Sequence, residues 1–210
     1  MLENIFNKLR KNKKIVIDLN ELLKEDNYKL KNIKPVSLDL EEKLIETAAY
    51  AESNSNTNIA KVITSIYGKV NKNFAGEVEE IPGKGIKAKY NLKNVYAGNR
   101  KLLFDNNINF SQVDEDGIIV YVAEDNKYLG YIHLDIELTC KLEEEMYYLK
   151  DKNYDLVLVS GHKKDVVEKV ANSLGIEEFY YGLEGKMKED KINELEDKYN
   201  AIRYRENMCV

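Results

Sequence analysis

The spacing of apolar residues along the chain changes twice, which predicts segments of different kinds. Residues 14–19 read KIVIDL, a short run rich in branched apolar side chains that is typical of a buried parallel strand, and Asp18 ends that strand. Open α/β sheets bind ligands at the carboxyl ends of their strands, although Asp also suits turns and helix caps. Residues 20–38 are polar, contain Pro35 and are interpreted as a connector.

The middle of the chain predicts a pair of helices lying on an antiparallel sheet. Residues 39–52 place apolar side chains on one helical face, and a second helix is expected after the polar break NSNTN. Glu-Asp-Asn at the centre of a long alternating run predicts a hairpin. The expected elements are helices at 39–52, 59–70 and from near Arg100, strands at 74–81, 85–91 and 94–99, and the hairpin at 118–134.

Strand and helix patterns alternate in the last third of the chain, at the spacing of βαβ units. Helices are expected at 139–150, 163–175 and 189–198, and strands at 154–160, 177–182 and 200–204. Because the only other strand of this kind ends at Asp18, the simplest architecture is a parallel α/β domain interrupted by the antiparallel one. The predicted domains are a discontinuous one, residues 1–34 and 134–210, and an inserted one, residues 35–133.

Composition narrows the classes of function. The chain has 210 residues, 33% of them charged, and its net charge of −5 is spread over interleaved Lys and Glu residues. That pattern is typical of a solvated surface and argues against a nucleic-acid partner. Cys140 and Cys209 are too far apart and too unaccompanied for a disulfide framework or a metal site.

The first residues predict a short amphipathic helix. Residues 2–14 are basic and amphipathic, and they lack the long apolar run of a signal peptide. No segment approaches the ~20 apolar residues of a membrane span, so a soluble cytoplasmic protein is expected. The N-terminal helix is expected to dock on the domain, with a position on a membrane surface as the alternative.

Five sequence strings occur in an order that resembles one known family. They are AAYAESNSNTNIAKVI from residue 48, IPGKGIKAK from residue 81, AGNRKLL from residue 97, VYVAEDNKYLGYIHL from residue 120 and VSGHKKDVVEKVANSLGIEEFYYGL from residue 159. Their order over roughly residues 8 to 200 resembles the cytoplasmic headpiece of a heavy-metal, copper-type P-type ATPase. The resemblance implies an α/β fold: a haloacid-dehalogenase-like parallel phosphorylation domain, truncated here, with an inserted α+β antiparallel-sheet nucleotide-binding domain.

The resemblance also implies a nucleotide pocket in the inserted domain. Its family positions are matched here by Glu52, Gly83, Gly85 and Asn99. Glycines allow close backbone approach, and Glu52 and Asn99 offer hydrogen bonds to adenine or ribose, so ATP or another adenine nucleotide is the expected ligand. The alternative is structural: the glycines make turns, Glu52 is a solvated helix-end charge and Asn99 caps the next helix.

One part of that pocket is missing. The family's Glu-His-Pro triplet is NTN at residues 56–58, which removes the imidazole that faces adenine. The loss is expected to weaken nucleotide binding by about 1 to 3 kcal/mol. Nearby lysines are candidates for attracting phosphates, with a solvated face as the alternative. These lysines are Lys84, Lys87 and Lys89.

The resemblance places the phosphorylation site at Asp18, but most of the surrounding family motif is absent. Asp-Lys-Thr-Gly-Thr-Leu-Thr is replaced by DLNELLK at residues 18–24, which lacks the lysine, the small hydroxyl residues and the glycine. Thr-Gly-Asp-Asn is replaced by SGHK at residues 160–163, and the family's phosphate-contacting lysine is matched by Lys191. The vestigial candidates for the site are Asp18, Ser160, Gly161 and Lys191.

Magnesium is not expected at this site. Where the family's Gly-Asp-Gly-x-Asn-Asp should follow, residues 205–208 read RENM, so no pair of aspartates is left to hold Mg²⁺. Turnover by this route is therefore chemically unsupported. His133 and His162 lack the spacing of metal ligands or of a triad; His133 is expected to be a strand residue, and His162 to lie in the loop above Asp18.

The retained fold residues and the missing chemical ones predict a catalytically inactive P-type-ATPase-like module. Such a module would bind adenine nucleotide weakly and act through a protein partner, a transporter or another complex. Two alternatives stay open. One is a haloacid-dehalogenase-type phosphatase or an ATPase that uses Asp18, and the other is an interaction domain without a ligand.

Overall fold

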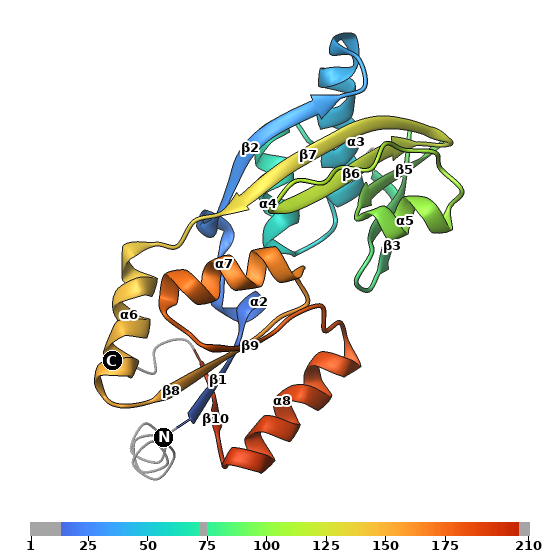
Figure 1. The fold of residues 1–210 in the computed structure, drawn as a ribbon. Helices are drawn as coiled ribbons and strands as arrows, with labels where there is room; N and C mark the ends of the chain where they lie inside the picture. Colours follow the sequence, from blue (N-terminus) through green and yellow to red (C-terminus); the bar gives the residue numbers. More distant parts are fainter. Residues whose placement is uncertain (1–13, 72–74, 206–210) are drawn as a thin grey trace. The chain divides into compact units, whose positions relative to one another are not determined.

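The chain divides into two compact units in the computed structural model, which describes residues 14–71 and 75–205 (Figure 1). Unit 1 is made of Met1–Asn27 and Leu138–Val210, and unit 2 is Tyr28–Glu137. The segment for which an N-terminal helix is predicted lies outside the described residues, apart from Lys14, which begins the first strand. None of the helices in the described ranges is both long and apolar enough to cross a membrane.

Unit 1 is built on a parallel sheet of four strands in the order β10-β1-β8-β9. The strands are β1 (Lys14–Asp18), β8 (Asp155–Val159), β9 (Glu178–Tyr180) and β10 (Ile202–Arg203). Ile15 of β1 lies opposite Leu156 of β8 on one side and Ile202 of β10 on the other, so β1 is an interior strand. Its residues 15–17 are completely buried, which explains a run of apolar side chains without alternation.

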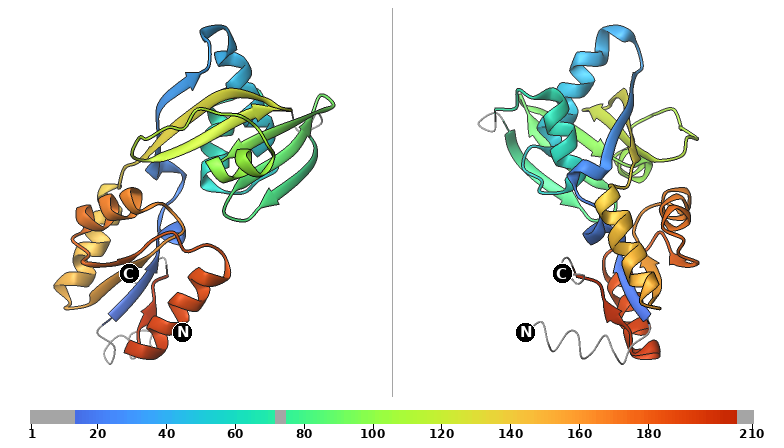
Figure 2. Two further views of the ribbon diagram at one scale, coloured as in Figure 1. Left: turned by 45° about the vertical axis from the view of Figure 1, so that its right-hand side comes forward. Right: turned by 90° about the vertical axis from the view of Figure 1, so that its left-hand side faces the viewer.

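Helices cover both faces of this sheet. They are α2 (Leu19–Leu22), α6 (Cys140–Asp151), α7 (Lys164–Leu174) and α8 (Lys186–Tyr199). Val16 and Val157 pack against Ile192 and Leu195 of α8, so α8 covers the face on which these valines point. Figure 1 and Figure 2 show α7 on the opposite side of the sheet from α8.

Unit 2 is built on an antiparallel sheet of six strands in the order β2-β7-β6-β5-β4-β3. The strands are β2 (Tyr28–Pro35), β3 (Ala75–Ile81), β4 (Gly85–Tyr90), β5 (Lys93–Gly98), β6 (Ile118–Glu124) and β7 (Lys127–Ile136). The helices are α3 (Glu41–Glu52), α4 (Asn58–Tyr67) and α5 (Arg100–Asp105), with the 3₁₀ turn η2 (Leu38–Leu40) before them; the other 3₁₀ turn, η1 (Glu25–Asn27), belongs to unit 1. The helix α3 packs against α4 and against β4, β5 and β6.

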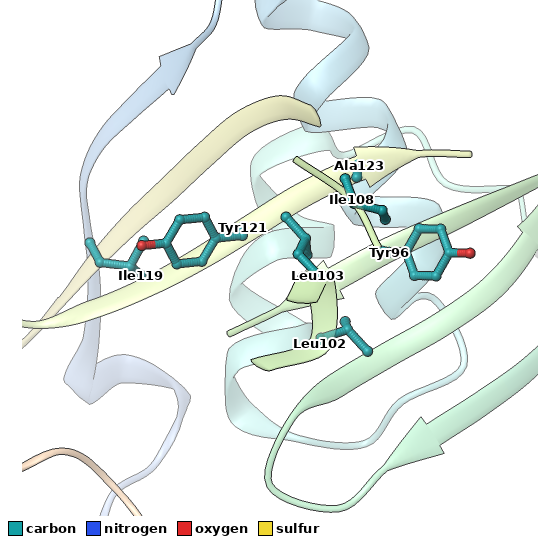
Figure 3. Close-up of a cluster of buried hydrophobic side chains, with 7 residues drawn as sticks. All are labelled: Tyr96, Leu102, Leu103, Ile108, Ile119, Tyr121 and Ala123. Carbon is teal, nitrogen blue, oxygen red and sulfur yellow. The ribbon is translucent and has the colours of Figure 1, made fainter. Parts of the chain in front are cut away.

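A second apolar cluster fills the other face of the unit 2 sheet, beneath α5 (Figure 3). Tyr96 belongs to this cluster, whereas its neighbour Ala97 does not, as alternation along β5 requires. The sheet therefore has apolar layers on both faces. The cluster consists of Tyr96, Leu102, Leu103, Ile108, Ile119, Tyr121 and Ala123.

The predicted helix pair, antiparallel strands, hairpin and βαβ units are all found, but the connector predicted at residues 20–38 is wrong. Tyr28–Pro35 forms β2, which pairs with β7 as an edge strand. Most of its residues are at least partly exposed, because only one side of an edge strand pairs with the sheet. Its sequence therefore reads as polar, and Pro35 is tolerated at its end.

Replacing Gly130 with Ala tests the pairing of β2. Gly130 has φ +137, and a Cβ there would lie 2.7 Å from Pro35 Cα and 2.6 Å from Leu44 Cδ1. The variant is expected to lose about 2 to 4 kcal/mol of unfolding free energy more than Gly182→Ala, whose φ is +66 but whose Cβ meets nothing within 4 Å. Urea unfolding of both variants measures the difference. Equal losses would mean that β2 does not pack against Gly130.

Candidate functional site

Asp18 stands at the carboxyl end of the interior strand β1, where the sequence predicts the centre of the unit 1 site. The residue is only 6% exposed. Its Oδ1 accepts a hydrogen bond of 3.0 Å from the Asn20 amide and so caps the short helix α2. A buried carboxylate in this position needs a further hydrogen bond or a cation to offset the loss of water.

Lys188 supplies that cation. Its Nζ lies 2.7 Å from Asp18 Oδ2, and its side chain is 20% exposed. Lys188 belongs to the first turn of α8, which follows Gly185 with φ 51. Each carboxylate oxygen of Asp18 therefore has a partner from within unit 1, the Asn20 amide for Oδ1 and the Lys188 ammonium for Oδ2.

Lys191, the lysine expected at this site, makes different contacts. Its Nζ donates to both carboxylate oxygens of Glu194, at 2.9 and 3.0 Å. The same ammonium lies 4.3 Å from the centroid of the Tyr180 ring. Lys188 and Lys191 are neighbours on α8, but the structure pairs only Lys188 with Asp18.

Ser160 and Gly161 follow β8 at the same edge of the sheet as Asp18. Ser160 is completely buried, and its Oγ accepts a hydrogen bond of 3.1 Å from the His162 amide. A Cβ on Gly161 would lie 3.2 Å from the Leu183 carbonyl oxygen, so the loop passes close to the segment that leads into α8. These contacts hold the loop at the carboxyl end of β8, the strand next to β1. The sequence predicts this loop near Asp18.

His162 is half-buried, and one nitrogen of its imidazole has no hydrogen-bond partner among the described residues. Its Nε2 is shut off from solvent and bonds to nothing among the described residues. The pKa of His162 is lowered to about 4, mainly by burial and also by the charge of Lys188, while the charges of Asp18 and Asp165 oppose the shift. The ring is therefore neutral at pH 7, so it adds no positive charge beside Asp18.

The residues present do not fit a magnesium ion at Asp18. The ammonium of Lys188 already lies on Asp18 Oδ2, where a divalent cation would have to bind. The described residues hold no group of three or more His, Cys, Asp or Glu side chains that suits a metal. Of the segment aligned with the family's magnesium motif, only Arg205 is described. We therefore derive no chemical step through a metal.

Glu52 ends the helix α3 of unit 2, and its carboxyl group is buried. The residue is 5% exposed, so the alternative of a solvated helix-end charge is wrong. Burial raises its pKa to about 8, with a further contribution from the charge of Glu80 on β3. In the part of the chain that the structure describes, this carboxyl makes no hydrogen bond or ion pair.

Asn99 and the two glycines hold one turn together. Asn99 Oδ1 caps α5 by accepting from the Lys101 amide at 2.9 Å, and Asn99 Nδ2 donates to the Gly83 carbonyl oxygen at 2.6 Å. A Cβ on Gly85 would lie 2.5 Å from Gly98 Cα, so strand packing alone requires glycine there. The roles of Gly83, Gly85 and Asn99 in the turn and in capping α5 are therefore enough to explain these three residues. Of the four predicted pocket residues, Glu52 is the one whose side chain has no hydrogen-bond partner among the described residues.

The other predicted contacts of the pocket are also engaged within unit 2. Thr57, which stands in the place of the family's histidine, caps α4 by accepting from the Ala60 amide at 3.1 Å. Lys84 pairs with Asp105, and Lys87 lies 6.0 Å from the centroid of the Tyr96 ring. Both lysines are therefore held at the surface of the sheet.

His133 is a strand residue, as predicted, and it is completely buried in β7. Its Nε2 lies 2.7 Å from the Asp116 carbonyl oxygen, and its Nδ1 lies 2.9 Å from Glu115 Oε2. Both partners belong to the loop before β6. His133 therefore anchors that loop and belongs to neither predicted site.

Residues 15–205 match the haloacid dehalogenase-like hydrolase family, described as a hydrolase. This match spans the strand that carries Asp18, the loop with Ser160 and the helix with Lys188. The chain belongs to this family. Its similarity in sequence and fold to the proteins described next also makes it homologous to the cytoplasmic domains of heavy-metal P-type ATPases.

Transporting ATPases are among the similar curated proteins. The cadmium, zinc and cobalt-transporting ATPase of Bacillus subtilis (strain 168) is 32% identical over 195 residues, which are 92% of this chain and 27% of that protein. The zinc-transporting ATPase of Synechocystis sp. is 30% identical over 88% of this chain and 25% of that protein. The chain thus spans about a quarter of the length of these relatives.

A solved structure supports the fold. The catalytic domain of the CPx-ATPase CopB-B superposes with a TM-score of 0.70 and 17% identity, over 95% of this chain and 72% of that one. At this identity the likeness concerns the arrangement of helices and strands. It confirms the predicted combination of a parallel sheet with an antiparallel one.

The sequence analysis did not identify Lys188 as a partner of Asp18, and it did not predict that Glu52 is buried. The signal for Lys188 is its place in the first turn of α8, which follows the short strand β9 and therefore starts at the carboxyl edge of the sheet. The signal for Glu52 is its place beside Ala48, Ala49 and Ala51 on the buried part of α3. Both signals require knowing which face of a helix packs.

Replacing Glu52 with Gln tests the buried acid. Because the folded protein holds a proton at Glu52 up to about pH 8, stability is expected to fall as pH rises from the ordinary carboxyl pKa of 4.5 to about 8. Urea unfolding should show that Glu52→Gln removes roughly 2 to 4 kcal/mol of this fall between about pH 5 and about pH 8. Parallel pH profiles for both proteins would mean that Glu52 is ionised at neutral pH.

Proposed function

We propose that this chain is a member of the heavy-metal P-type ATPase lineage that forms no phosphoenzyme, binds adenine nucleotide weakly through unit 2 and acts as a regulatory or interaction module. The observation that carries the proposal is the pairing of Asp18 Oδ2 with Lys188 Nζ at 2.7 Å. A carboxylate attacks phosphorus through an oxygen lone pair, and a hydrogen bond or an ammonium group on that oxygen lowers its nucleophilicity. Here one oxygen caps α2 and the other is bound by an ammonium group.

The surroundings of Asp18 also lack the groups that stabilise phosphoryl transfer. That reaction depends on cations and donors aimed at the phosphoryl oxygens and at the leaving group. The residue after Asp18 is Leu19, which is completely buried, and the imidazole of His162 is neutral. Among the described residues, Lys188 is the cation that pairs with Asp18, and its partner is the carboxylate itself.

The nucleotide part of the proposal rests on Glu52. A carboxyl group of a largely buried residue that has no partner within the protein keeps its hydrogen-bonding capacity for a ligand. Glu80 lies near the end of β3, directly before the Gly83 turn, so Glu52 and that turn belong to one region of unit 2. The solved catalytic domain of CopB-B comes from work on nucleotide binding, which supports the same assignment here.

The proposed partner is a protein, a transporter or another complex. Unit 1 exposes large apolar side chains that a partner surface would cover. They are Tyr147, Tyr181 and Met187, which are 74%, 47% and 59% exposed. Phosphatase or ATPase chemistry at Asp18 is the competing function, favoured by the position of that residue at the carboxyl end of β1.

A labelling experiment separates these two functions. Incubation with radiolabelled ATP or acetyl phosphate, with and without Mg²⁺, is expected to leave the protein unlabelled because Asp18 is held by Lys188. The control is Asp18→Asn, which should give the same blank result. A hydroxylamine-sensitive label on the original protein that is absent from the control would identify an acyl phosphate on Asp18 and overturn the proposal.

Titration with ATP tests the nucleotide part. Amide resonances of residues 52, 83, 85 and 99 are expected to shift with a Kd of roughly 0.1 to 1 mM or weaker, equally with and without Mg²⁺. Glu52→Leu should abolish these shifts while raising the unfolding free energy, because it removes a buried acid. Gly85→Val is unsuitable, since its side chain would displace Gly98. If ATP at millimolar concentration moves none of these resonances, unit 2 binds no nucleotide.

A further inference from the structure

The imidazole of His133 in unit 2 is completely buried and has an oxygen atom beside each of its two nitrogens. Its Nε2 lies 2.7 Å from the Asp116 carbonyl oxygen, and its Nδ1 lies 2.9 Å from Glu115 Oε2. The contact at Nδ1 is not aligned for a hydrogen bond, so its strength depends on charge. A carbonyl oxygen and a carboxylate oxygen both accept hydrogen bonds, and neither of them can donate one.

The doubly protonated ring is the form of His133 that suits both oxygens. A neutral imidazole has a proton on one nitrogen and a lone pair on the other. With the proton on Nε2, the lone pair of Nδ1 faces the Glu115 carboxylate, and with the proton on Nδ1, the lone pair of Nε2 faces the Asp116 carbonyl oxygen. The imidazolium donates at Nε2 and attracts Glu115 at Nδ1, which offsets the cost of burying its charge.

A second residue holds Glu115 in place as a carboxylate. Its Oε1 accepts a hydrogen bond of 2.7 Å from Tyr131, two positions before His133 on β7. That hydrogen bond is the main reason why the pKa of Glu115 lies below its ordinary value; burial opposes the shift, and the charge of His133 adds to it. Glu115 therefore keeps its negative charge over the pH range in which histidine side chains change theirs.

Both partners of His133 belong to residues 106–117, the segment between α5 and β6, which we call the strap. The first part of the strap packs on the apolar cluster beneath α5, where the Phe110 ring meets the Tyr121 ring edge-on with centroids 5.2 Å apart. The amide of Val113 donates to the Tyr121 hydroxyl at 3.1 Å, and its side chain packs against the same cluster. Apolar contacts thus hold the strap as far as Val113.

His133 holds the carboxyl-terminal end of the strap. A Cβ on Gly117, whose φ is +99, would lie 2.9 Å from His133 Nε2, so the backbone of the strap passes directly beside the ring. With the contacts of Glu115 and Asp116, three consecutive strap residues meet one buried imidazole. The end of the strap therefore depends on the protonation state of that ring.

Other titratable groups share this face of the sheet with His133. Residues directly opposite one another in neighbouring strands point to the same face, as do alternate residues of one strand. The helix α3 packs on the other face, where Leu44 lies against Gly130 of β7. The charge of Lys31, in the bulge of β2, acts on Glu115 and competes with His133 for it. The remaining groups are Tyr131 and Asp135 on β7, Tyr121 on β6, and Lys29 and Lys34 on β2.

We propose that His133 is a proton-dependent latch: as an imidazolium it holds the end of the strap against β7 through Glu115 and Asp116, and loss of its second proton releases that end. The charged ring makes both contacts, so the latch is closed at low pH and opens as pH rises. Because Val113 packs on the apolar cluster, release of the strap uncovers part of that cluster. The latch depends neither on nucleotide nor on Asp18.

Nuclear magnetic resonance of the full chain tests the latch, because His133 and His162 are its only histidines. The ring-nitrogen resonances of His133, assigned with His133→Gln, show whether one or both nitrogens hold a proton. The cross-peak between the Val113 methyl groups and the Tyr121 ring reports the closed strap. Between about pH 5.5 and about pH 8.5 the ring is expected to lose one proton and this cross-peak about half or more of its intensity. The cross-peak between Phe110 and Tyr121 should persist.

Two variants separate the latch from a general effect of pH. In Glu115→Gln the carboxamide can donate to Nδ1 of a neutral ring, so both nitrogens gain a partner without any charge. Its cross-peak between Val113 and Tyr121 is expected to be equally strong at both pH values. Asp114→Asn is the matched control, because it removes the same charge from the adjacent, exposed residue of the strap. This control should depend on pH as the original protein does.

Four results would overturn the inference. A His133 ring that is neutral at about pH 5.5, or doubly protonated still at about pH 8.5, has no change of charge to operate a latch. If the ring loses its proton while the Val113 cross-peak keeps its intensity, His133 titrates without holding the strap. If Asp114→Asn abolishes the pH dependence as Glu115→Gln does, the effect comes from net charge. If Glu115→Gln retains that dependence, another group controls the strap.

Discussion

The burial of Asp18 at the carboxyl end of β1 is the constraint on which the properties of unit 1 depend. β8 pairs with β1 as far as Asp18, which lies opposite Val159, and Asp18 is only 6% exposed. A carboxylate enclosed in this way is tolerated only with close positive charge and hydrogen bonds. Lys188 and the Asn20 amide meet that need from within the chain.

The pairing of Asp18 with Lys188 bears on the proposed function. In a phosphorylating enzyme the positive charge beside the acceptor carboxylate belongs to a metal ion and is shared with the incoming phosphoryl group. In this chain the charge is part of α8 and is directed at the carboxylate itself. Under the proposed function, the fold of the family is kept while a side chain takes the place of the reactants.

Unit 2 also has a buried acidic residue, but this one has no cation bound to it. Glu52 is as deeply buried as Asp18, but it forms no ion pair with any described residue. Without a cation, the carboxyl is neutral below about pH 8. A neutral acid in a buried position is a hydrogen-bond donor as well as an acceptor, which gives unit 2 a chemical property that its sequence alone does not suggest.

The sequence predicts the fold well because most of its elements have a strong apolar period. The buried strands β1 and β8, the helix pair and the hairpin of β6 and β7 all belong to this class. β2 escapes prediction because an edge strand with exposed lysines lacks that period. Lys188 and Lys191 are one turn apart on α8, and only the packing of that helix determines which of them reaches Asp18.

A structure determined with beryllium fluoride and Mg²⁺ tests the central claim most directly, because beryllium fluoride binds carboxylates that are able to accept a phosphoryl group. The account predicts that Asp18 stays free of it and that Lys188 Nζ stays within hydrogen-bonding distance of Asp18 Oδ2, as in the present structure. Beryllium fluoride bound to Asp18 with Mg²⁺ beside it, and Lys188 displaced or turned toward the fluorides, would contradict it.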